Sequence, residues 1–550
     1  MKTERFETDV LCVGGGIAGL MAAIRAAELG ADVIVAEKGN SARSGEARAG
    51  NDHFWCYIPE VHGSDLTEFI QECLLTQLGL FVLGFGTPVM KTWMERSFEI
   101  VKLWDNWGIP MKYNGKWEFA GHSFPGRLLT HLKYCGKEQK PILTRETLKK
   151  GVRIMNRVMI FELLGNANGV VGALGIDTRS DRMIEFQAKT VILGTGAVDR
   201  LFPNITPGLI GNQQRPITVC GDGRAMAYRL GAELVDTEGL NRHIGPKNFC
   251  RAGQATWVGM YRDACGNPLG KYVTKPDKKY GDILPEVDKQ VFTRLLATGR
   301  GPFYMDCTGN SADDIEYMRF WLMNEGNMGL LKYFDDEKMD FRKSQVEFQT
   351  YAIRGGGRIL GDEHTRTAVK GLYVAGEEAY ATISSAAVFG WIAGEQAAAY
   401  AKTTPDPDIA KSATHITEIR EKVNALQSRS YGPDWRDANM ALQNTLSDYA
   451  GLIRSQTMLE AGLEHLRRLK AKAHENMKAA NQWELTRCLE VLNLYDLGEL
   501  VFLGALERKE SRNLHQRIDY PYTDPLLNNK VLAIKKIGSK PVLEWKDVAK

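Results

Sequence analysis

Arginine residues that could bind an anion occur in two stretches near the middle of the chain. Arg242 and Arg251 lie in the first stretch, and Arg354 precedes a run of three glycines in the second. A guanidinium group is planar and donates paired hydrogen bonds to a carboxylate, sulfate or phosphate. The alternative for each arginine is an ion pair on the surface or between domains. We expect Arg242 and Arg354 to bind a small anionic substrate with Arg251 nearby, and Arg262 and Arg358 are further candidates.

Two histidines are candidates for a proton transfer that would accompany chemistry on such an anion. His243 follows Asn241 and Arg242 directly, and His364 follows the second stretch. Imidazole is the side chain whose charge changes near neutral pH, so it is a common general acid or base. We expect His243 to transfer the proton beside Asn241, with His364 as the second candidate. The alternative for either residue is a structural histidine.

These side chains would need a cofactor, and the N-terminal stretch Thr8–Lys38 predicts one. An apolar strand ends at Val13, the next six residues match G-x-G-x-x-G, and an alanine-rich helix follows. Such glycines allow a tight turn, close approach of a pyrophosphate and close packing of helix on strand, and the helix N-terminus attracts phosphates. Glu37 ends the second strand, where an acidic residue binds ribose hydroxyls. The alternative is a tight turn in an ordinary α/β unit. The predicted cofactor contacts are Gly14, Gly16, Ala18, Gly19, Glu37 and Lys38.

Later segments repeat the pattern of a strand followed by small residues. The strand Gln187–Gly196 ends in a Thr-Gly turn, a glycine pair encloses Asp222 at a helix start, and the strand Val369–Glu377 precedes an alanine-rich helix. The small, polar loop Arg43–Asp52 suits a segment that wraps a cofactor, with a plain surface loop as the alternative. Helix capping alone would account for Asp222. The predicted contacts from these segments are Ser44, Gly45, Gly50, Asn51, Thr195, Gly196, Asp222, Glu377, Ser384 and Ser385.

The composition of the 550 residues argues against several classes of protein. The chain has 70 basic and 67 acidic residues and a net charge of +3, which argues against a nucleic-acid-binding surface. No apolar run reaches the ~18 residues that a membrane span needs, and no signal peptide is recognisable, so a cytoplasmic location is expected. The nine cysteines include no CxxC pair, so we expect no metal site or iron–sulfur cluster within this chain.

The order of these patterns predicts an α/β protein built from several domains. We expect a Rossmann-like cofactor-binding domain with an inserted α+β capping domain and a C-terminal helical bundle. One helix is predicted from Ala312 to Tyr333, and the C-terminal tail is expected on the surface or along a partner. The predicted boundaries are 1–235 and 346–403 for the cofactor-binding domain, 236–345 for the capping domain, 404–507 for the helical domain and 508–550 for the tail.

In this order, the motifs resemble the succinate dehydrogenase, fumarate reductase and adenylylsulfate reductase flavoprotein family. The resemblance implies an FAD-binding domain, two-electron flavin chemistry and a hetero-oligomer with an iron–sulfur protein subunit. The stretches EGLNRHIGPKNF (238–249), GRGPFYMD (299–306) and KEQKPILTRETLKK (137–150) are most similar to the adenylylsulfate reductase flavoprotein subunit. The other segments that carry the resemblance are VGGGIAGLMAA (13–23), ARSGEARAG (42–50), TVILGTG (190–196), GDGRAMAYRLGAEL (221–234), GLYVAGE (371–377), FGWIAGEQAA (389–398) and RKESRNLHQRIDYP (508–521).

Several family motifs are altered, and each change affects an expectation. Glycine instead of histidine follows Ser44, so FAD is expected to be bound non-covalently. Ile244-Gly245-Pro246 replaces the His-Pro-Thr motif of fumarate reductases, and their Gly-Ala-Asn-Arg segment after the Ala-Gly-Glu turn is absent. Tyr134-Cys135-Gly136 replaces the Ile-His-Gly segment of adenylylsulfate reductase.

The sequence therefore favours an FAD-dependent oxidoreductase subunit of the fumarate or adenylylsulfate reductase type. It would act on a small anion and exchange electrons with an iron–sulfur partner. The alternative is a flavin relay subunit of a larger redox complex without its own substrate. A self-contained oxidase resembling aspartate oxidase is a weaker third hypothesis, because it too would be expected to keep the fumarate-type motifs.

Overall fold

The computed structural model describes residues 1–74, 86–121, 123, 125–203, 215–247, 257–271, 273–280, 291–380 and 382–548. Within these ranges, the description does not extend to the side chains of residues 241–243, 293, 353 and 354.

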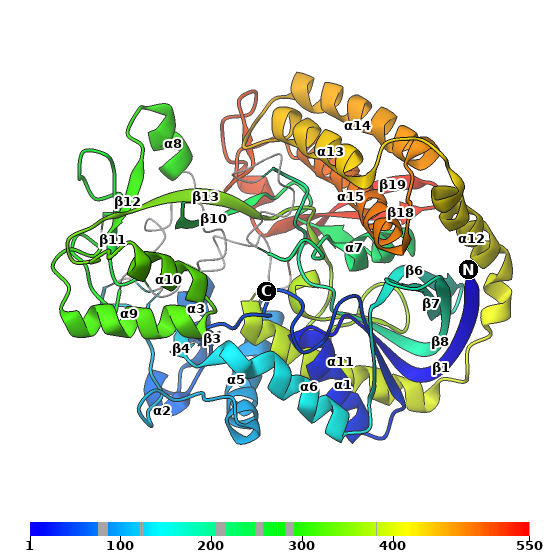
Figure 1. Ribbon diagram of the computed structural model, residues 1–550, viewed down its shortest axis with the longest axis horizontal. Coiled ribbons are helices and arrows are strands. Elements are labelled where there is room, and N and C mark those ends of the chain that lie inside the picture. The colour runs from blue at the N-terminus through cyan, green and yellow to red at the C-terminus, as the bar shows by residue number, and fades with distance from the viewer. Residues whose placement is uncertain are drawn as a thin grey trace.

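A seven-stranded sheet forms the centre of the cofactor-binding domain (Figure 1). Its order is β5-β2-β1-β8-β7-β6, and β15 also pairs with β8. β1 pairs in parallel with β2 and β8, whereas β7 pairs antiparallel with β6 and β8. The apolar strand ends are buried, as expected of parallel strands covered by helices. The strands are β1 (Lys2–Val13), β2 (Val33–Glu37), β5 (Arg153–Asn156), β6 (Val158–Asn166), β7 (Gly169–Asp177), β8 (Arg182–Leu193) and β15 (Leu372–Val374).

Two helices from distant parts of the chain, α1 (Ile17–Glu28) and α11 (Thr382–Thr403), pack against each other beside this sheet. A Cβ atom added at Gly390 of α11 would lie 2.5 Å from the carbonyl oxygen of Ala18, and one added at Gly394 would overlap the carbonyl oxygen of Ala22. Glycine therefore permits the close approach of the two helices. Helices α5 (Thr87–Trp107) and α6 (Gln139–Lys149) pack against α11 and α1, respectively.

The capping domain is a four-stranded antiparallel sheet with helices, at the left of Figure 1. Its order is β10-β13-β12-β11, so β13 belongs to this sheet although it begins just after the predicted boundary at residue 345. Gly326, at φ +92°, separates α9 from α10, so the single helix predicted from Ala312 to Tyr333 is wrong. The elements are β10 (Asn241–Pro246), β11 (Met260–Arg262), β12 (Phe303–Asp306), β13 (Val346–Arg354), α8 (Val291–Ala297), α9 (Ala312–Asn324) and α10 (Met328–Asp336).

A second four-stranded sheet joins the C-terminal tail to the middle of the chain. Its order is β14-β9-β18-β19, formed by β14 (Arg358–Ile359), β9 (Leu234–Val235), β18 (Lys530–Ile537) and β19 (Lys540–Asp547). Ala533 pairs with Val235, which in turn pairs with Arg358. The tail therefore packs on this chain beside the segments that connect the capping domain to the rest of the protein.

Four helices form the C-terminal helical domain, and their arrangement confirms the predicted fold class (Figure 1). Asp434 and Asp437 form a capping box at the start of the second helix, and Asn481 caps the last. The helices are α12 (Ala413–Ser428), α13 (Trp435–Tyr449), α14 (Gln456–Asn476) and α15 (Gln482–Glu507). Shorter elements are α2 (Pro59–His62), α3 (Leu66–Cys73), α7 (Asp222–Arg229), β3 (His53–Trp55), β4 (His131–Lys133), β16 (Ile453–Arg454), β17 (Gln516–Arg517) and the 3-10 turns η2 (Gly136–Glu138), η4 (Gly376–Glu378), η5 (Ile409–Ser412) and η6 (Pro525–Leu527).

Candidate cofactor and active site

The glycine turn lies where the ends of β1 and β8 meet the start of α1. Gly14 has φ +100°, and a Cβ atom there would lie 2.5 Å from the carbonyl oxygen of Gly194. A Cβ atom at Gly19 would overlap the carbonyl oxygen of Gly14. A Cβ atom at Gly16 would meet only the Gly194 oxygen, at 3.6 Å, so other protein atoms leave room for it. Close packing of backbone therefore explains Gly14 and Gly19, whereas the space beside Gly16 would let a pyrophosphate approach, as predicted.

Glu37 is fixed at the end of β2 beside this turn. Its carboxylate accepts hydrogen bonds of 2.6 Å from the backbone nitrogens of Gly15 and Gly39, and one of 2.8 Å from the Ser44 hydroxyl. Ser41, which sequence reasoning missed, also lies at this turn, and its buried hydroxyl oxygen has no hydrogen-bond partner. A fixed carboxylate next to a buried hydroxyl in need of a partner fits the polar adenosine half of FAD.

A buried cation, which the sequence analysis also missed, lies at the same turn. Lys140 of α6 is 1% exposed, and its ammonium group donates a hydrogen bond to the carbonyl oxygen of Gly15. Burial lowers the pKa of Lys140 to about 8, against the opposing effect of the Glu37 carboxylate. A positive charge beside the N-terminus of α1 suits a bound diphosphate. Only the fold shows this role, because α6 reaches the turn from a distant part of the sequence.

Replacing Glu37 by alanine should weaken FAD binding without unfolding the helical domain. We expect a loss of roughly 1–3 kcal/mol, the usual contribution of hydrogen bonds to a charged group. Flavin absorbance per protein after purification, together with circular dichroism, would measure the effect. Unchanged flavin content in the Glu37→Ala protein would contradict the assignment of Glu37 to the cofactor.

A second buried carboxyl group, that of Glu378 in η4, connects the later segments that are predicted to bind the cofactor. It accepts a 3.2 Å hydrogen bond from the backbone nitrogen of Thr195 and a bond from the Thr195 hydroxyl. The Thr195 hydroxyl accepts a 3.1 Å bond from the backbone nitrogen of Gly223. Glu378 therefore links the ends of β8 and β15 to the start of α7.

Burial raises the pKa of Glu378 from 4.5 to about 7, although Arg224 and Thr195 oppose this shift. The folded state thus keeps a proton that the unfolded state loses, so stability falls as pH rises from about 4.5 to about 7. Replacing Glu378 by glutamine should remove this pH dependence. In the parent, the free energy of unfolding should fall by roughly 3 kcal/mol over this pH range. Urea unfolding of the flavin-free variant and parent at several pH values would measure it. A stability difference that is constant with pH would contradict the prediction.

The other predicted cofactor residues lie around the same strand ends. Trp93 donates a 2.9 Å hydrogen bond from its indole nitrogen to the Ser384 hydroxyl, and the Ser385 hydroxyl donates to the carbonyl oxygen of Thr382. Glu377 lies 3.2 Å from the Arg215 guanidinium, which also pairs with Glu46. The cofactor roles of these residues, and those of Gly45, Gly50, Asn51 and Gly196, remain predictions. The non-covalent attachment of FAD also remains a prediction.

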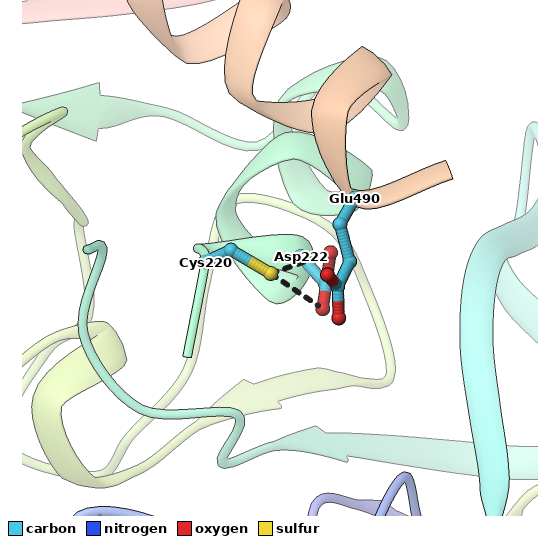
Figure 2. A group of neighbouring side chains, drawn as sticks. All are labelled: Cys220, Asp222 and Glu490. Carbon is cyan, nitrogen blue, oxygen red and sulfur yellow. Dashed lines mark hydrogen bonds between the residues drawn. The ribbon is translucent and has the colours of Figure 1, made fainter. Parts of the chain in front are cut away.

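Lys38 and Asp222 have side chains in a buried charged cluster between the cofactor-binding and helical domains. Cys220, Asp222 and Glu490 place three metal-ligand atoms within 4.8 Å of one another (Figure 2). However, the Lys38 ammonium lies 2.5 Å from Asp222, 2.8 Å from Glu490 and 3.5 Å from the Cys220 sulfur. Burial holds the pKa of the Cys220 thiol well above its usual value, which disfavours the thiolate that a metal requires. Lys38 is thus one cation of the cluster, beside Arg200 and Arg487, which each lie 2.7 Å from Glu490. The predicted FAD contacts of Lys38 and Asp222 remain predictions.

The predicted substrate residues come together through a strand pair. In the antiparallel pairing of β10 with β13, Asn241 lies opposite Arg354, Arg242 opposite Ala352 and His243 opposite Tyr351. The side chains of Asn241, Arg242, His243 and Arg354 lie outside the described residues, as does Arg251 altogether. The backbone therefore places Asn241, Arg242, His243 and Arg354 at one end of one strand pair.

The remaining candidates from the sequence have other surroundings. Arg262 lies 2.5 Å from Asp306 and Arg358 lies 2.9 Å from Asp236, so the ion-pair alternative holds for these two arginines. His364 lies on an exposed turn, 3.7 Å from Glu363, with 47% of its side chain accessible. Of the two histidine candidates, only His243 lies on a strand of the predicted substrate site.

Comparisons with known proteins agree with the predicted family and fold class. A family model described as "FAD binding domain" matches residues 9–390, and one described as "Fumarate reductase flavoprotein C-term" matches residues 439–550. The chain is 25% identical to one of the subunits of Fumarate reductase (CoM/CoB) from Methanothermobacter marburgensis, over 98% of this chain and 99% of that protein.

Solved structures show the same fold. Adenylylsulfate reductase from Archaeoglobus fulgidus superposes with a TM-score of 0.84 at 22% identity, covering 100% of this chain and 96% of that chain. FrdA of E. coli quinol fumarate reductase has a TM-score of 0.83 at 19% identity, covering 100% and 98% of the two chains. In the part of the chain that the structure describes, no helix is long and apolar enough to cross a bilayer.

The two family models together cover most of the sequence. The chain therefore belongs to the flavoprotein family of succinate dehydrogenase, fumarate reductase and adenylylsulfate reductase, and it is an FAD-dependent oxidoreductase.

Proposed function

We propose that this chain is the catalytic flavoprotein subunit of an oxidoreductase that transfers two electrons to or from a small anionic substrate and exchanges them with an iron–sulfur partner. The observation that carries the proposal is the pairing of β10 with β13, which brings Asn241, Arg242, His243 and Arg354 together.

These two strands are also the connections between the capping and cofactor-binding domains. β9 precedes β10, β14 follows β13, and β9 pairs with β14 through Val235 and Arg358. Asn241 and Arg354 therefore lie at the junction between the two domains. Substrates of α/β enzymes commonly bind where a second domain meets the carboxyl ends of the sheet strands.

The chemistry follows from the residue types at this junction. FAD, when bound, would supply hydride chemistry. Arg242 and Arg354 would hold the anion through their guanidinium groups, and His243 would transfer a proton at a ring nitrogen. Asn241 would fix the orientation of the anion by a hydrogen bond.

An iron–sulfur partner is supported by the lack of a cysteine-rich site in the described residues. The eight cysteines there are unpaired, and six of them are fully buried. Single electrons would therefore leave the flavin for a centre on another protein. The name of the relative from Methanothermobacter marburgensis describes it as a subunit, which is consistent with a multi-subunit assembly.

The flavin-loaded protein can be tested with reduced benzyl viologen as electron donor and fumarate or adenylylsulfate as acceptor. Acceptor-dependent oxidation of the viologen would support the catalytic role and identify the substrate class. Viologen oxidation by an added iron–sulfur protein, with no response to either small anion, would favour the relay alternative instead.

A further inference from the structure

The C-terminal tail forms a buried ionic network with the segment that leads into β10. The side chain of Arg508 is 0% exposed, and its guanidinium lies 2.6 Å from Oε1 of Glu238 and 2.7 Å from Oε1 of Glu510, which are both buried. The same guanidinium lies 4.7 Å from the ring centre of Trp545 in β19. Buried ion pairs are screened little by solvent, and loss of one partner would leave an uncompensated buried charge. The carboxylate of Glu238 is therefore firmly held.

The backbone of Glu238 is held as well, by an arginine of the helical domain. Arg454 is 1% exposed and donates 2.7 Å hydrogen bonds to the carbonyl oxygen of Glu238 and to Nδ1 of His515. Since arginine only donates, His515 accepts at Nδ1 and donates from Nε2 to the carbonyl oxygen of Arg508, 3.1 Å away. Burial and the charge of Arg454 keep the pKa of His515 well below its usual value, so its ring is neutral, as this bonding requires.

A short and tightly packed turn separates Glu238 from the proposed substrate residues. The backbone nitrogen of Gly239 donates a 3.0 Å bond to the carbonyl oxygen of Asp236, and Leu240 is 2% exposed. Asn241, the first residue of β10, follows at once. Three residues of chain span at most about 11 Å, so the network holds the start of β10 from close by.

Helix α15 packs on both connections between the capping domain and the rest of the protein. A Cβ atom added at Gly504 of this helix would overlap the hydroxyl oxygen of Thr237 in the first connection. In the returning connection, a Cβ atom at Gly356 would lie 3.4 Å from the Cβ atom of Leu497 in the same helix. These connections continue into the paired ends of β10 and β13. The helical domain and the tail therefore determine where this end of the strand pair lies.

We propose that Glu238 is a positioning residue for catalysis and that Arg508 of the tail completes the substrate site by holding it, an inference that rests on the proposed function. Glu238 acts through Asn241 and Arg242 and not by contact with the anion. It fixes the start of β10, so that these two residues meet the anion in the geometry that the reaction needs. The tail thus serves the substrate site although Arg508 lies 270 positions from Glu238 in the sequence.

Glu238→Gln tests this role, because it keeps the size of the side chain and removes its charge. Flavin-loaded variant and parent are compared in the viologen assay with fumarate and with adenylylsulfate as acceptors. We expect kcat/KM for the anion to fall by about 10²-fold, the effect of a displacement of roughly 1 Å. The rate at which reduced benzyl viologen reduces the flavin in the absence of an anion should not change. Loss of both rates to the same extent, or of neither, would overturn the positioning role.

Glu162→Gln is the matched control for the loss of a buried charge at the boundary of the helical domain. Glu162 of β6 is buried and lies 3.0 Å from Arg229, which also pairs with Asp496 of α15 at 2.8 Å. This arginine has two acidic partners, as Arg508 has, but β6 belongs to the central sheet and not to the capping connections. We expect the parent's kcat/KM in this variant. A loss as large as that of Glu238→Gln would show that the effect is not specific to the network.

A second variant and a readout without substrate complete the test. If Glu238→Gln does not retain flavin, Arg508→Lys replaces it, because lysine keeps the charge but lacks the planar fork that reaches both carboxylates. Hydrogen–deuterium exchange in residues 236–246 of the flavin-loaded protein should be faster in the Glu238 variant and unchanged in the Glu162 variant. Unchanged exchange in both would refute the role of Glu238 by itself. Failure of the parent with both anions would refute the proposed function, and the exchange would still decide whether the network fixes β10.

Discussion

Replacing Gly19 by alanine is expected to give a protein that neither binds FAD nor folds stably. The added Cβ atom would overlap the carbonyl oxygen of Gly14, a backbone atom fixed by the pairing of β1 with β2 and β8. Backbone atoms of a central sheet cannot move aside as a flexible side chain can. We expect destabilisation by about 3 kcal/mol, the upper end of the usual range for inserting a carbon atom into a packed core.

Gly16→Ala is the matched control, because it adds the same atom three residues earlier in the same turn. Its Cβ atom would be 3.6 Å from the Gly194 oxygen, an ordinary contact, and Gly16 has an unstrained φ of −72°. This variant should unfold at the parent's temperature in the flavin-free state but bind less FAD, because the methyl group blocks the approach of the pyrophosphate. Calorimetry and flavin absorbance would distinguish the two effects. Equal stability of Gly19→Ala and Gly16→Ala would contradict the packing explanation.

Arg242→Ala should abolish most of the turnover while leaving the flavin spectrum unchanged. Removing one positive donor that stabilises developing negative charge typically costs about 10²–10³-fold in kcat. The loss should appear in kcat/KM for the anionic substrate, measured with the viologen assay on flavin-loaded protein.

Arg342→Ala provides the control for loss of a guanidinium group elsewhere in the capping domain. Arg342 is exposed, pairs with Asp340 at 3.1 Å and precedes β13, at the end of that strand opposite to Arg354. Its replacement should leave turnover unchanged. If Arg242→Ala kept full activity, the substrate role of the strand pair would be wrong and the relay hypothesis would be favoured.

The sequence predicted the features that depend on local spacing. The strand, glycine turn and helix around Gly14 and Gly19 are contiguous, so their geometry follows from residue types alone. The same holds for the second helix that supports the site, α11, and for the helical character of the C-terminal domain. The family resemblance is likewise confirmed, because its motifs extend over most of the chain.

Features that depend on contacts between distant segments could not be predicted. Lys140 reaches Gly15 across 125 positions of sequence, and Glu378 reaches Thr195 across 183 positions. Lys38 follows Glu37 directly, but its ammonium pairs with Glu490 in α15, which no local pattern indicates. His53 is an isolated histidine in the sequence, and only the pairing of β3 with β4 places it beside Lys133.

The pairing of β18 with β9 has a consequence for biosynthesis. β9 lies at residues 234–235, immediately before the capping domain, yet its neighbour in the sheet lies at residues 530–537. During translation, β9 and β14 can pair with each other as soon as both have left the ribosome, but one edge of β9 remains exposed until β18 has also been synthesised. Exposed strand edges promote wrong associations between chains. The sheet that connects the capping domain to the rest of the protein thus stays incomplete until β18 joins it, so a chain truncated before β18 would present an open edge at this point.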